Sequence, residues 1–367
     1  MKKKNVLIWY WGRFGAAQKY TLDIINEFIK INKQKKNINL FFSFSENSEL
    51  NYLYKRIKIK NYPIKTFDNS YEAILKTLNI HKLRHDFLTF LKNKKIDVIF
   101  CPMFHYWNPF ISSKFNLLNI KYVLSIHDFN LHPGENSFFK KKIYEIEKKN
   151  ADKYVCFSRH IQKKLIKINK VSVDKVLLSS FYTKNKLYKK NNKVKKLKFL
   201  FFGRFLEYKG IGKLIKIFSK KYFVDNNITL TLIGSAGKNF NLPVIKTKNI
   251  KIISSWVHEN KLDKIIKKYD ICILPYDEGS QSGVIPIMFR NSIPVISTPV
   301  GGLSNQIKHN INGLVSINKN TFSIEKEIKR VLNLNFFYKL RKGAYDQAAK
   351  DNTAFKKNII KLNNFLR

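Results

Sequence analysis

The sequence lacks the two glycine-rich motifs that most often mark nucleotide chemistry. The loop after its first apolar run reads WGRFGAA rather than GxGxxG, and no GxxxxGK[ST] phosphate loop occurs anywhere in the 367 residues. These absences argue against nicotinamide chemistry and against ATP hydrolysis. Cysteine is scarce too, because only Cys101, Cys156 and Cys272 occur, far apart and in or beside apolar runs. Without CxxC or Cys/His spacing they indicate neither a metal site nor disulfides, so we expect small buried side chains in a reducing compartment.

Acidic residues are few. The chain has 25 Asp and Glu against 70 Lys and Arg, a formal net charge of +45. A compositional bias towards lysine is one reading, and a positive surface potential that attracts an anionic partner is the other. Residues 139–143 (FKKKI) and 163–167 (KKLIK) set cations beside apolar residues, a pattern that suits peripheral contact with an anionic membrane. No nucleic-acid-binding module is recognisable, so we expect no nucleic-acid partner.

Long hydrophobic runs are also missing. No apolar run approaches the ~18 residues that span a bilayer. Residues 6–10 (VLIWY) follow three lysines but are too short for a signal peptide, and Arg13 and Lys19 come next without a small-residue cleavage site. We therefore expect a buried first strand and a cytoplasmic protein, either free or peripheral on the inner face of the membrane.

The apolar pattern that is present predicts an α/β fold. Continuous apolar runs alternate with segments of helical period, which indicates parallel sheets covered on both faces. The expected strands are Asn5–Tyr10, Ile38–Phe44, Asp97–Phe100, Tyr122–Ile126, Tyr154–Phe157, Phe199–Phe202, Ile228–Ile233, Ile250–Ile253, Ile271–Leu274 and Pro294–Ser297. The expected helices of the second half include Ile211–Phe218, Asn260–Lys268 and Ser323–Val331, with a closing amphipathic helix over Ala354–Leu366.

The length of 367 residues favours two domains. A polar, lysine-rich stretch from Tyr182 to Lys198 has no apolar periodicity and marks the linker. We predict two doubly wound Rossmann-like domains facing each other across a cleft, over residues 1–182 and 183–349. Residues 350–367 follow the second domain.

Two cations follow the first strand of the second half. Gly203 and Arg204 end the apolar run FLFF, and Lys209-Gly210 precede the helix that starts at Ile211. In an open parallel sheet, ligands bind at the carboxyl ends of the strands. Arginine holds phosphate oxygens in a bidentate fork and lysine acts as a compact point charge. A single arginine after a strand is usually only solvated, but the pair in one turn indicates a diphosphate site.

Two further turns follow strands of the second half. After Ile271–Leu274 comes PYDEGSQSGV, in which Ser282 can cap a helix and Gly283 lets a phosphate approach backbone N–H groups. Capping and phosphate binding are compatible, so this motif alone does not separate them. Gly301-Gly302 after the strand at Pro294–Ser297 provides either a tight turn or close backbone approach to a ligand.

The first half offers histidines at strand ends. His127-Asp128 follows Tyr122–Ile126 and fits either a polarised proton carrier or an aspartate that orients a buried histidine. His105 lies among aromatic residues just beyond another strand, where rings stack on a sugar face or simply pack. The small residues of the loop Gly12–Ala17 could leave room for an acceptor.

These pieces together resemble a known family. The string FFGRFLEYKGIGKLIKIF, the block LPYDEGSQSGVIPIMFRNSIPVISTPVGGLSNQI and NGLV at Asn312–Val315 are similar to the retaining glycosyltransferases of family 4, which have the GT-B fold. The resemblance is strong over Phe199–Val315. Before it, the support is the glycine loop, IHDFNLHPGE and Phe157-Ser158-Arg159.

The resemblance implies roles for particular residues. The second domain would bind a nucleoside diphosphate sugar as donor substrate, with no other cofactor and no metal, and the first would bind the acceptor, with the closing helix crossing back to it. Arg204 and Lys209 match diphosphate-binding cations, and His127 matches a residue that contacts the transferred sugar, with Asp128 orienting it. The implied donor set is Gly203, Arg204, Lys209, Val257 near the base, Gln281, Ser282, Gly283 and Val284. The implied acceptor set is Gly12, Arg13, Gly15 and His105.

The sequence departs from the family at one place. Many members carry two glutamates eight positions apart before the PV strand, and here these positions hold Gly279 and Ile287. Glu278, one place off, is the candidate for the first carboxylate. The QSGV pattern resembles a branch of the family without the pair.

The sequence thus predicts a retaining glycosyltransferase that moves a sugar to a carbohydrate or lipid-linked acceptor, in synthesis of cell-surface polysaccharide or glycolipid. A nucleotide-sugar or glycan-binding protein without catalysis, on the same fold, is the alternative. A basic protein that binds membranes or nucleic acid is the second alternative.

Overall fold

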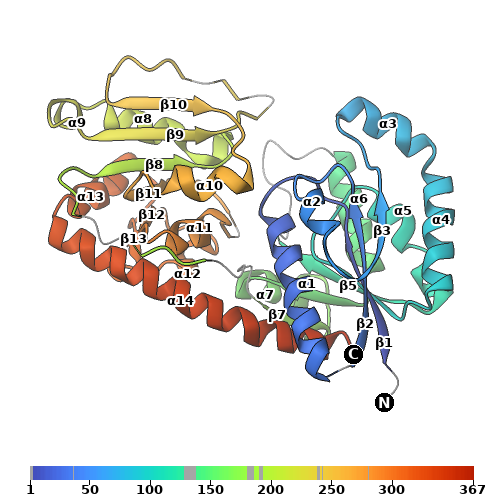
Figure 1. Cartoon of the computed structure of the whole chain (residues 1–367). Coiled ribbons are helices and arrows are strands. Elements are labelled where there is room, and N and C mark those ends of the chain that lie inside the picture. Colours follow the sequence, from blue (N-terminus) through green and yellow to red (C-terminus); the bar gives the residue numbers. More distant parts are fainter. Residues whose placement is uncertain are drawn as a thin grey trace. The chain divides into compact units, whose positions relative to one another are not determined.

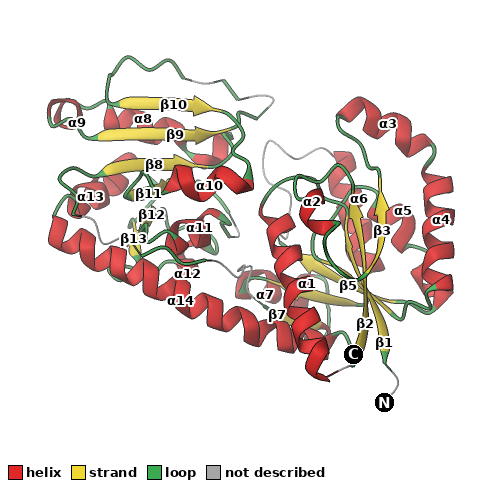
Figure 2. Ribbon diagram, viewed as in Figure 1, coloured by secondary structure: helices red, strands yellow, loops and turns green. Residues whose placement is uncertain are grey.

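The computed structural model describes residues 3–35, 37–127, 138–179, 186–189, 193–237, 240–241, 243–279 and 281–367. Its described residues form two compact units, which Figures 1 and 2 show as two sheets with their helices. The first unit takes residues from 3–127, 138–179 and 354–367, and the second from 186–353. Asp128 lies outside the described residues, so its predicted role remains a prediction.

The first unit contains a seven-stranded parallel sheet in the order β3-β2-β1-β4-β5-β6-β7. Its helices and strands are β1 (Lys4–Tyr10), α1 (Ala16–Lys35), β2 (Ile38–Ser45), α2 (Asn51–Tyr54), β3 (Lys60–Ile64), α3 (Ser70–Leu78), α4 (Ile80–Asn93), β4 (Val98–Cys101), α5 (Asn108–Ser112), η1 (Phe115–Leu118), β5 (Lys121–Ile126), α6 (Phe138–Asn150), β6 (Lys153–Cys156), α7 (Arg159–Ile168), η2 (Val173–Lys175) and β7 (Val176–Leu178).

The second unit contains a six-stranded parallel sheet in the order β10-β9-β8-β11-β12-β13. Its elements are β8 (Lys198–Phe202), η3 (Glu207–Lys209), α8 (Ile211–Phe218), α9 (Lys221–Asp225), β9 (Thr229–Gly234), β10 (Ile250–Ser254), α10 (Glu259–Ile266), β11 (Ile271–Leu274), α11 (Val284–Arg290), β12 (Val295–Ser297), α12 (Leu303–Gln306), β13 (Gly313–Val315), α13 (Thr321–Val331) and α14 (Leu334–Phe365). In each sheet, the strands that follow the first strand are added first on one side of it and then on the other. The order changes side between β1 and β4 in the first sheet and between β8 and β11 in the second, as in doubly wound sheets.

The side chains of β1 point alternately to the two faces of the first sheet, and both faces are covered by helices. Val6 and Ile8 pack with residues of α1 in one buried cluster, and Leu7 and Trp9 pack in a second cluster with residues of α4. Successive side chains of a strand point to opposite faces, so a strand that is apolar at every position must be covered twice. The first strand therefore lies in the interior of the sheet.

The last helix contributes to both units. The part of α14 up to Thr353 lies in the second unit, and Ala354–Arg367 lies in the first. Phe355 and Ile359 are buried in the cluster that contains α1, and the Lys153 ammonium donates to the carbonyl of Phe365 at 3.2 Å. The first unit is thus built from segments that are distant in sequence.

The three cysteines are buried and unpaired as disulfides, as the sequence predicted. Burial raises the pKa of the Cys101 and Cys156 thiols to about 12. A thiol with so high a pKa carries almost no thiolate at neutral pH, so these side chains are chemically inert packing groups.

Candidate functional site

The order of the second sheet locates its ligand-binding edge. β8 and β11 are neighbours, yet β9 follows β8 on one side and β12 follows β11 on the other. The loops after β8 and β11 therefore diverge, and such a switch point is where open α/β sheets bind ligands. The predicted donor residues Gly203–Lys209 and Gln281–Val284 follow these two strands.

The turn after β8 begins with an unusual backbone. Gly203 has φ of +135° and its N–H donates to the carbonyl of Ile233 at 3.0 Å. A Cβ at Gly234, at the end of β9, would lie 1.8 Å from the Gly203 carbonyl oxygen. Only glycine permits this approach, which places the exposed Arg204 at the strand end.

Lys209 lies against the loop after the neighbouring strand. Its Nζ atom is 3.7 Å from the centroid of the Tyr276 ring and 4.8 Å from that of Tyr208. The next residue, Gly210, has φ of +68°, and a Cβ there would lie 2.1 Å from the carbonyl oxygen of Pro275. The β8 turn and the β11 loop are therefore packed backbone to backbone.

Tyr276 is the buried ring against which Lys209 lies. Burial raises the pKa of its phenol, the Ser282 hydroxyl opposes the rise, and the positive charge of Arg204 opposes it further. Lys209 thus lies on a ring that is 1% exposed, and the Arg204 charge acts on the phenol of the same side chain. The sequence analysis did not single out Tyr276, although its place two residues after β11 was a usable signal.

The QSGV segment is held by a glutamine from α12. The Ser282 N–H donates to Gln306 Oε1 at 2.8 Å, and Gln306 Nε2 donates to the Ser282 carbonyl at 3.1 Å. Gly283 occupies the cap position of α11, while the Ser282 hydroxyl accepts from the Val284 N–H at 3.3 Å. Ser282 therefore acts on the helix start from one residue outside the cap. Gln306 was not foreseen, because its contact is tertiary.

The predicted donor residue Val257 and the predicted catalytic residue Glu278 lie on loops of the same sheet edge. Val257 follows β10, is half-buried, and packs against the core of the second unit. Glu278 is half-buried in the loop after β11, beside Asp277, whose carboxylate pairs with Lys213. Ile287, at the second glutamate position, packs against the core from α11. The predicted roles of Val257 and Glu278 remain predictions.

The predicted acceptor residues of the first unit gather at its own switch point, beside the ends of β1 and β4. The Arg13 guanidinium carbon lies 5.0 Å from the centroid of the Phe67 ring, and the His105 ring lies 5.5 Å from the same ring. Arg13 also pairs with Asp68 at 3.7 Å. Phe67, which the sequence analysis missed, therefore joins the two predicted side chains.

His105 is held neutral. Burial, and to a smaller extent the positive charge of Arg13, lower its pKa to about 3. Its Nδ1 atom accepts from the Trp107 N–H at 3.3 Å. At neutral pH this imidazole therefore acts as a hydrogen-bonding group and carries no charge.

The two glycines of the predicted acceptor set serve the backbone in different ways. A Cβ at Gly12 would lie 2.4 Å from the Tyr10 hydroxyl oxygen, so a side chain there would force that ring to move. Gly15 has φ of +89° and open space around it. Gly15 thus adopts a conformation that larger residues rarely adopt, whereas Gly12 leaves room for the Tyr10 ring.

His127 lies where the sequence predicted it, directly after β5. Its Nε2 atom bonds to the carbonyl oxygen of Pro102 at 2.8 Å, so this nitrogen carries the proton. The ring also packs 4.6 Å from that of Phe157. The bond fixes the ring beside the β4–α5 loop, which also carries His105.

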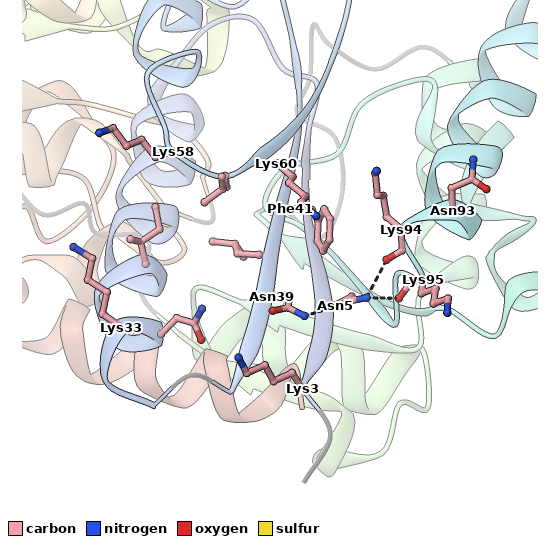
Figure 3. A pocket seen from close by; sticks show the side chains of 14 residues that line it. Lys3, Asn5, Lys33, Asn39, Phe41, Lys58, Lys60, Asn93, Lys94 and Lys95 are labelled. Atoms are coloured by element: carbon pink, nitrogen blue, oxygen red, sulfur yellow. Dashed lines mark hydrogen bonds between the residues drawn. The ribbon is translucent and has the colours of Figure 1, made fainter.

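A cavity of about 890 Å³ lies at the opposite edge of the first sheet, beside the first residues of β1, β2 and β3. Figure 3 shows the Asn5 amide at its floor, donating to the carbonyls of Lys94 and Lys95 at 2.9 Å each. Six of its lining residues are lysines: Lys3, Lys33, Lys58, Lys60, Lys94 and Lys95. None of the predicted site residues lines it.

Within the described residues, no group of three or more His, Cys, Asp or Glu side chains is placed to hold a metal ion. Over the same residues, no helix is long and apolar enough to cross a bilayer.

Comparison with known proteins supports a class for this site. Residues 183–351 match the family described as "Glycosyl transferases group 1". A stretch of 139 residues is 29% identical to an uncharacterized glycosyltransferase of Methanocaldococcus jannaschii. That stretch covers 36% of this chain and 35% of the relative, so the match spans about a third of the curated relative's length.

Solved structures show the architecture. The chain is similar to Anabaena HepE, solved in complex with UDP-glucose, with a TM-score of 0.71, 14% identity, and coverage of 99% of this chain and 98% of that one. It is also similar to sucrose-phosphate synthase of Thermosynechococcus elongatus, with a TM-score of 0.73, 13% identity, and the same coverage. The predicted GT-B fold is thereby confirmed, with parallel sheets of seven and six strands. The domain match and the fold together support a glycosyltransferase.

Proposed function

We propose that the protein transfers a sugar from a nucleoside diphosphate sugar to a carbohydrate or lipid-linked acceptor, with retention at the anomeric carbon. The second unit would bind the donor and the first unit the acceptor, in synthesis of cell-surface polysaccharide or glycolipid. The observation that carries this proposal is that Arg204 and Lys209 share the turn after β8, with Lys209 against the Tyr276 ring, at the switch point of a domain that matches group 1 glycosyl transferases.

The chemistry follows from the charges. When the bond between the anomeric carbon and the diphosphate oxygen breaks, its electron pair stays on the diphosphate. Fixed cations stabilise that developing charge without reorganising, which lowers the barrier. An acceptor hydroxyl then forms the new bond to the same carbon and passes its proton to the departing diphosphate, which has gained the electron pair. Arg204 and Lys209 are the cations, and His127 holds the transferred sugar.

Uridine donors are the first to test. Anabaena HepE, which shares the fold, was solved with UDP-glucose. In this chain the base would lie beside the loop after β10, where Val257 turns its side chain into the core and leaves the backbone to meet the ligand.

Donor binding by single-charge variants tests the proposal. A panel of UDP-sugars and other nucleotide sugars is screened by thermal shift, since a ligand that binds only the folded state raises its melting temperature. For the donor found, Arg204→Ala and Lys209→Ala should each weaken affinity about ten- to hundred-fold, the worth of a charged hydrogen bond. Lys216→Ala, which removes an exposed lysine from α8, is the matched control. Unchanged donor affinity and turnover in the Arg204/Lys209 double variant would refute the mechanism.

A binding protein without catalysis is the second candidate, because the position of the family's second glutamate holds Ile287, packed against the core. Donor consumption separates the two candidates. Release of the nucleoside diphosphate in the presence of acceptor extracts supports transfer, and proton NMR of the product's anomeric centre tests retention. Donor binding with neither hydrolysis nor transfer would favour the second candidate.

Peripheral contact with an anionic membrane belongs to the proposal, as does a cytoplasmic location. The sequence pattern suggested that the apolar residues of the two basic segments contact the membrane. Two of them, Ile143 and Leu165, are instead buried in the first unit. Phe138, just before the first basic segment, is 85% exposed. Among the described side chains, the surface at these segments thus offers cations and the neighbouring Phe138 ring rather than an apolar stripe.

A further inference from the structure

Helix α3 turns its apolar side chains towards solvent. Tyr71, Ile74, Leu75 and Leu78 are 72%, 66%, 44% and 72% exposed. Their spacing of i, i+3, i+4 and i+7 puts them on one face of the helix. In a surface helix of a globular protein that face normally packs on the core, so here the usual orientation is reversed. Figure 2 shows α3 at the periphery of the first unit, beyond the edge strand β3.

The polar side chains of α3 hold it in this orientation. The Lys76 ammonium donates to the carbonyl of Thr66 at 2.6 Å and pairs with Glu72 at 3.1 Å. Thr77 Oγ1 accepts from the Trp107 indole at 2.8 Å, and Asn69 caps the helix by accepting from the Glu72 N–H at 2.9 Å. The polar face is thus bonded to the unit, and rotating the apolar face inward would break these contacts.

The charges around α3 suit an anionic surface. Its two neighbouring acids are already paired, Asp68 with Arg13 and Glu72 with Lys76. Three cations flank the apolar face in the sequence and form no ion pair with a carboxylate of the described residues: Lys65, Lys82 and Arg84. Each cation near an anionic bilayer contributes about 1 kcal/mol of attraction.

The size of the face and the net charge argue against a second copy of this chain. A stable protein interface uses about 20–30 residues a side, whereas the apolar face of α3 has four side chains. A net charge of +45 also makes two copies repel each other, while it draws the protein towards anionic lipid. We propose that α3 is the surface through which the protein docks on an anionic lipid bilayer, with these four side chains at the boundary between headgroups and acyl chains.

Docking through α3 would bring the predicted acceptor residues to the membrane, and at this point the inference rests on the proposed function. The Trp107 indole that bonds to Thr77 lies two residues after His105, and Asp68, which precedes α3, pairs with Arg13. The docking helix is therefore bonded to the loop that carries His105, and the segment that leads into the helix is paired with Arg13. The inference assigns the acceptor class as one held at the bilayer surface, a lipid-linked glycan or glycolipid. The lysine-lined cavity lies at the other edge of the sheet and takes no part.

Vesicle co-sedimentation of the full chain tests the docking surface. The probes are vesicles of equal parts phosphatidylcholine and phosphatidylglycerol, and vesicles of phosphatidylcholine alone. Wild type should bind the anionic vesicles, and the variant Y71Q/I74Q/L78Q should partition at least ten-fold more weakly. Leu117→Gln, which removes an apolar side chain that is 76% exposed in η1, is the matched control and should bind as wild type does.

Three outcomes would overturn the inference: no binding of wild type to anionic vesicles, equal binding by the triple variant, or a dimer that only wild type forms. If wild type and the triple variant bind equally and added salt abolishes the binding of both, adsorption would be due to lysines spread over the whole surface and not to α3. The donor-induced thermal shift is measured in parallel and should match wild type in the triple variant, which also shows that the variant folds. Absent donor binding in every protein would refute the proposed function and leave the vesicle result standing.

Discussion

The ammonium group of Lys209 lies 3.7 Å from the centre of the Tyr276 ring, so one cation of the candidate site rests on an aromatic face. The ring belongs to the loop after β11 and the lysine to the turn after β8, and these strands flank the switch point. A cation over a ring gains about 0.5–2 kcal/mol, depending on how far it is desolvated. Tyr276 therefore positions Lys209 before any ligand arrives.

The ring of Tyr276 should matter more than its hydroxyl. We expect Tyr276→Phe to keep donor affinity within about three-fold of wild type, because the aromatic face that holds Lys209 is kept. Tyr276→Leu should weaken donor affinity about ten-fold, since the lysine loses its platform. Isothermal calorimetry with the donor identified by the thermal-shift screen measures both. Equal affinity in the two variants would show that Lys209 is positioned by other contacts.

Gly210 should be irreplaceable where Gly212 is not. A Cβ at Gly210 would lie 2.1 Å from the Pro275 carbonyl at a positive φ, whereas a Cβ at Gly212 meets nothing within 4 Å. We expect Gly210→Ala to lower the free energy of unfolding by about 2–4 kcal/mol, from backbone strain plus the clash. Gly212→Ala, inside α8, should raise it by about 0.5–1 kcal/mol. Urea unfolding measures both variants, and similar stabilities for the two would contradict the packing described for this turn.

Glu147 should make the first unit less stable as pH rises. Its carboxyl is fully buried, accepts from Ser112 at 2.7 Å and from the Tyr122 hydroxyl, and burial raises its pKa from 4.5 to about 7. Between these two values the folded state binds more protons than the unfolded state, so stability falls as pH rises from about 4.5 to 7. The full loss is about 3 kcal/mol, from 1.36 kcal/mol per pKa unit.

Glu147→Gln should remove that part of the pH dependence and stabilise the protein at pH 7. Unfolding midpoints in urea across pH 4.5 to 8 measure the difference from wild type. Glu145→Gln, on the same helix α6, removes a half-buried carboxylate that pairs with Lys148 at 2.6 Å, and should keep the wild-type slope. Identical pH slopes for Glu147→Gln and wild type would contradict the raised pKa.

Lys95 should be replaceable with a gain in stability. It follows α4 with φ of +47°, a left-handed conformation that costs a lysine about 1–2 kcal/mol and suits asparagine better. We expect Lys95→Asn to raise the free energy of unfolding by about 0.5–1 kcal/mol. Lys94→Asn removes the same charge at a φ of −89° and should bring no such gain. A gain in both variants would assign the effect to charge repulsion around the cavity.

The sequence predicted strongly periodic elements well and short polar ones poorly. Ile211–Phe218 and Ile271–Leu274 have the predicted bounds, because their apolar pattern is unbroken. β3 was missed because Pro63 and two polar residues interrupt its pattern, and β13 because it has three residues. The closing helix was expected at Ala354–Leu366, yet α14 begins at Leu334 and carries Gly343 in its interior. A Cβ there would lie 1.9 Å from the Ile311 carbonyl, so that glycine serves a tertiary contact that no local pattern reveals.

In the candidate site, too, some residues could be predicted from the sequence and others could not. Arg204 and Lys209 could be predicted because both follow one strand in a single turn. Gln306 and Phe67 could not, since each acts through a partner that lies 24 or more residues away in the chain. The place of Tyr276 after β11 was a usable signal, but its contact with Lys209 also joins residues that are far apart in the chain. Only the strand order brings these pairs together.

The first unit contains both amino-terminal residues and the residues after Thr353, which affects the order in which the two units fold during synthesis. Phe355, Ile359, Leu362 and Leu366 fill the same buried cluster as residues of β1 and α1. The amino-terminal segment therefore waits, with an apolar surface uncovered, until the residues after Thr353 have been synthesised. The second unit, whose described residues run from 186 to 353, has its whole core translated before that point. The first unit, which contains the amino-terminal residues, is thus the last to complete its buried core.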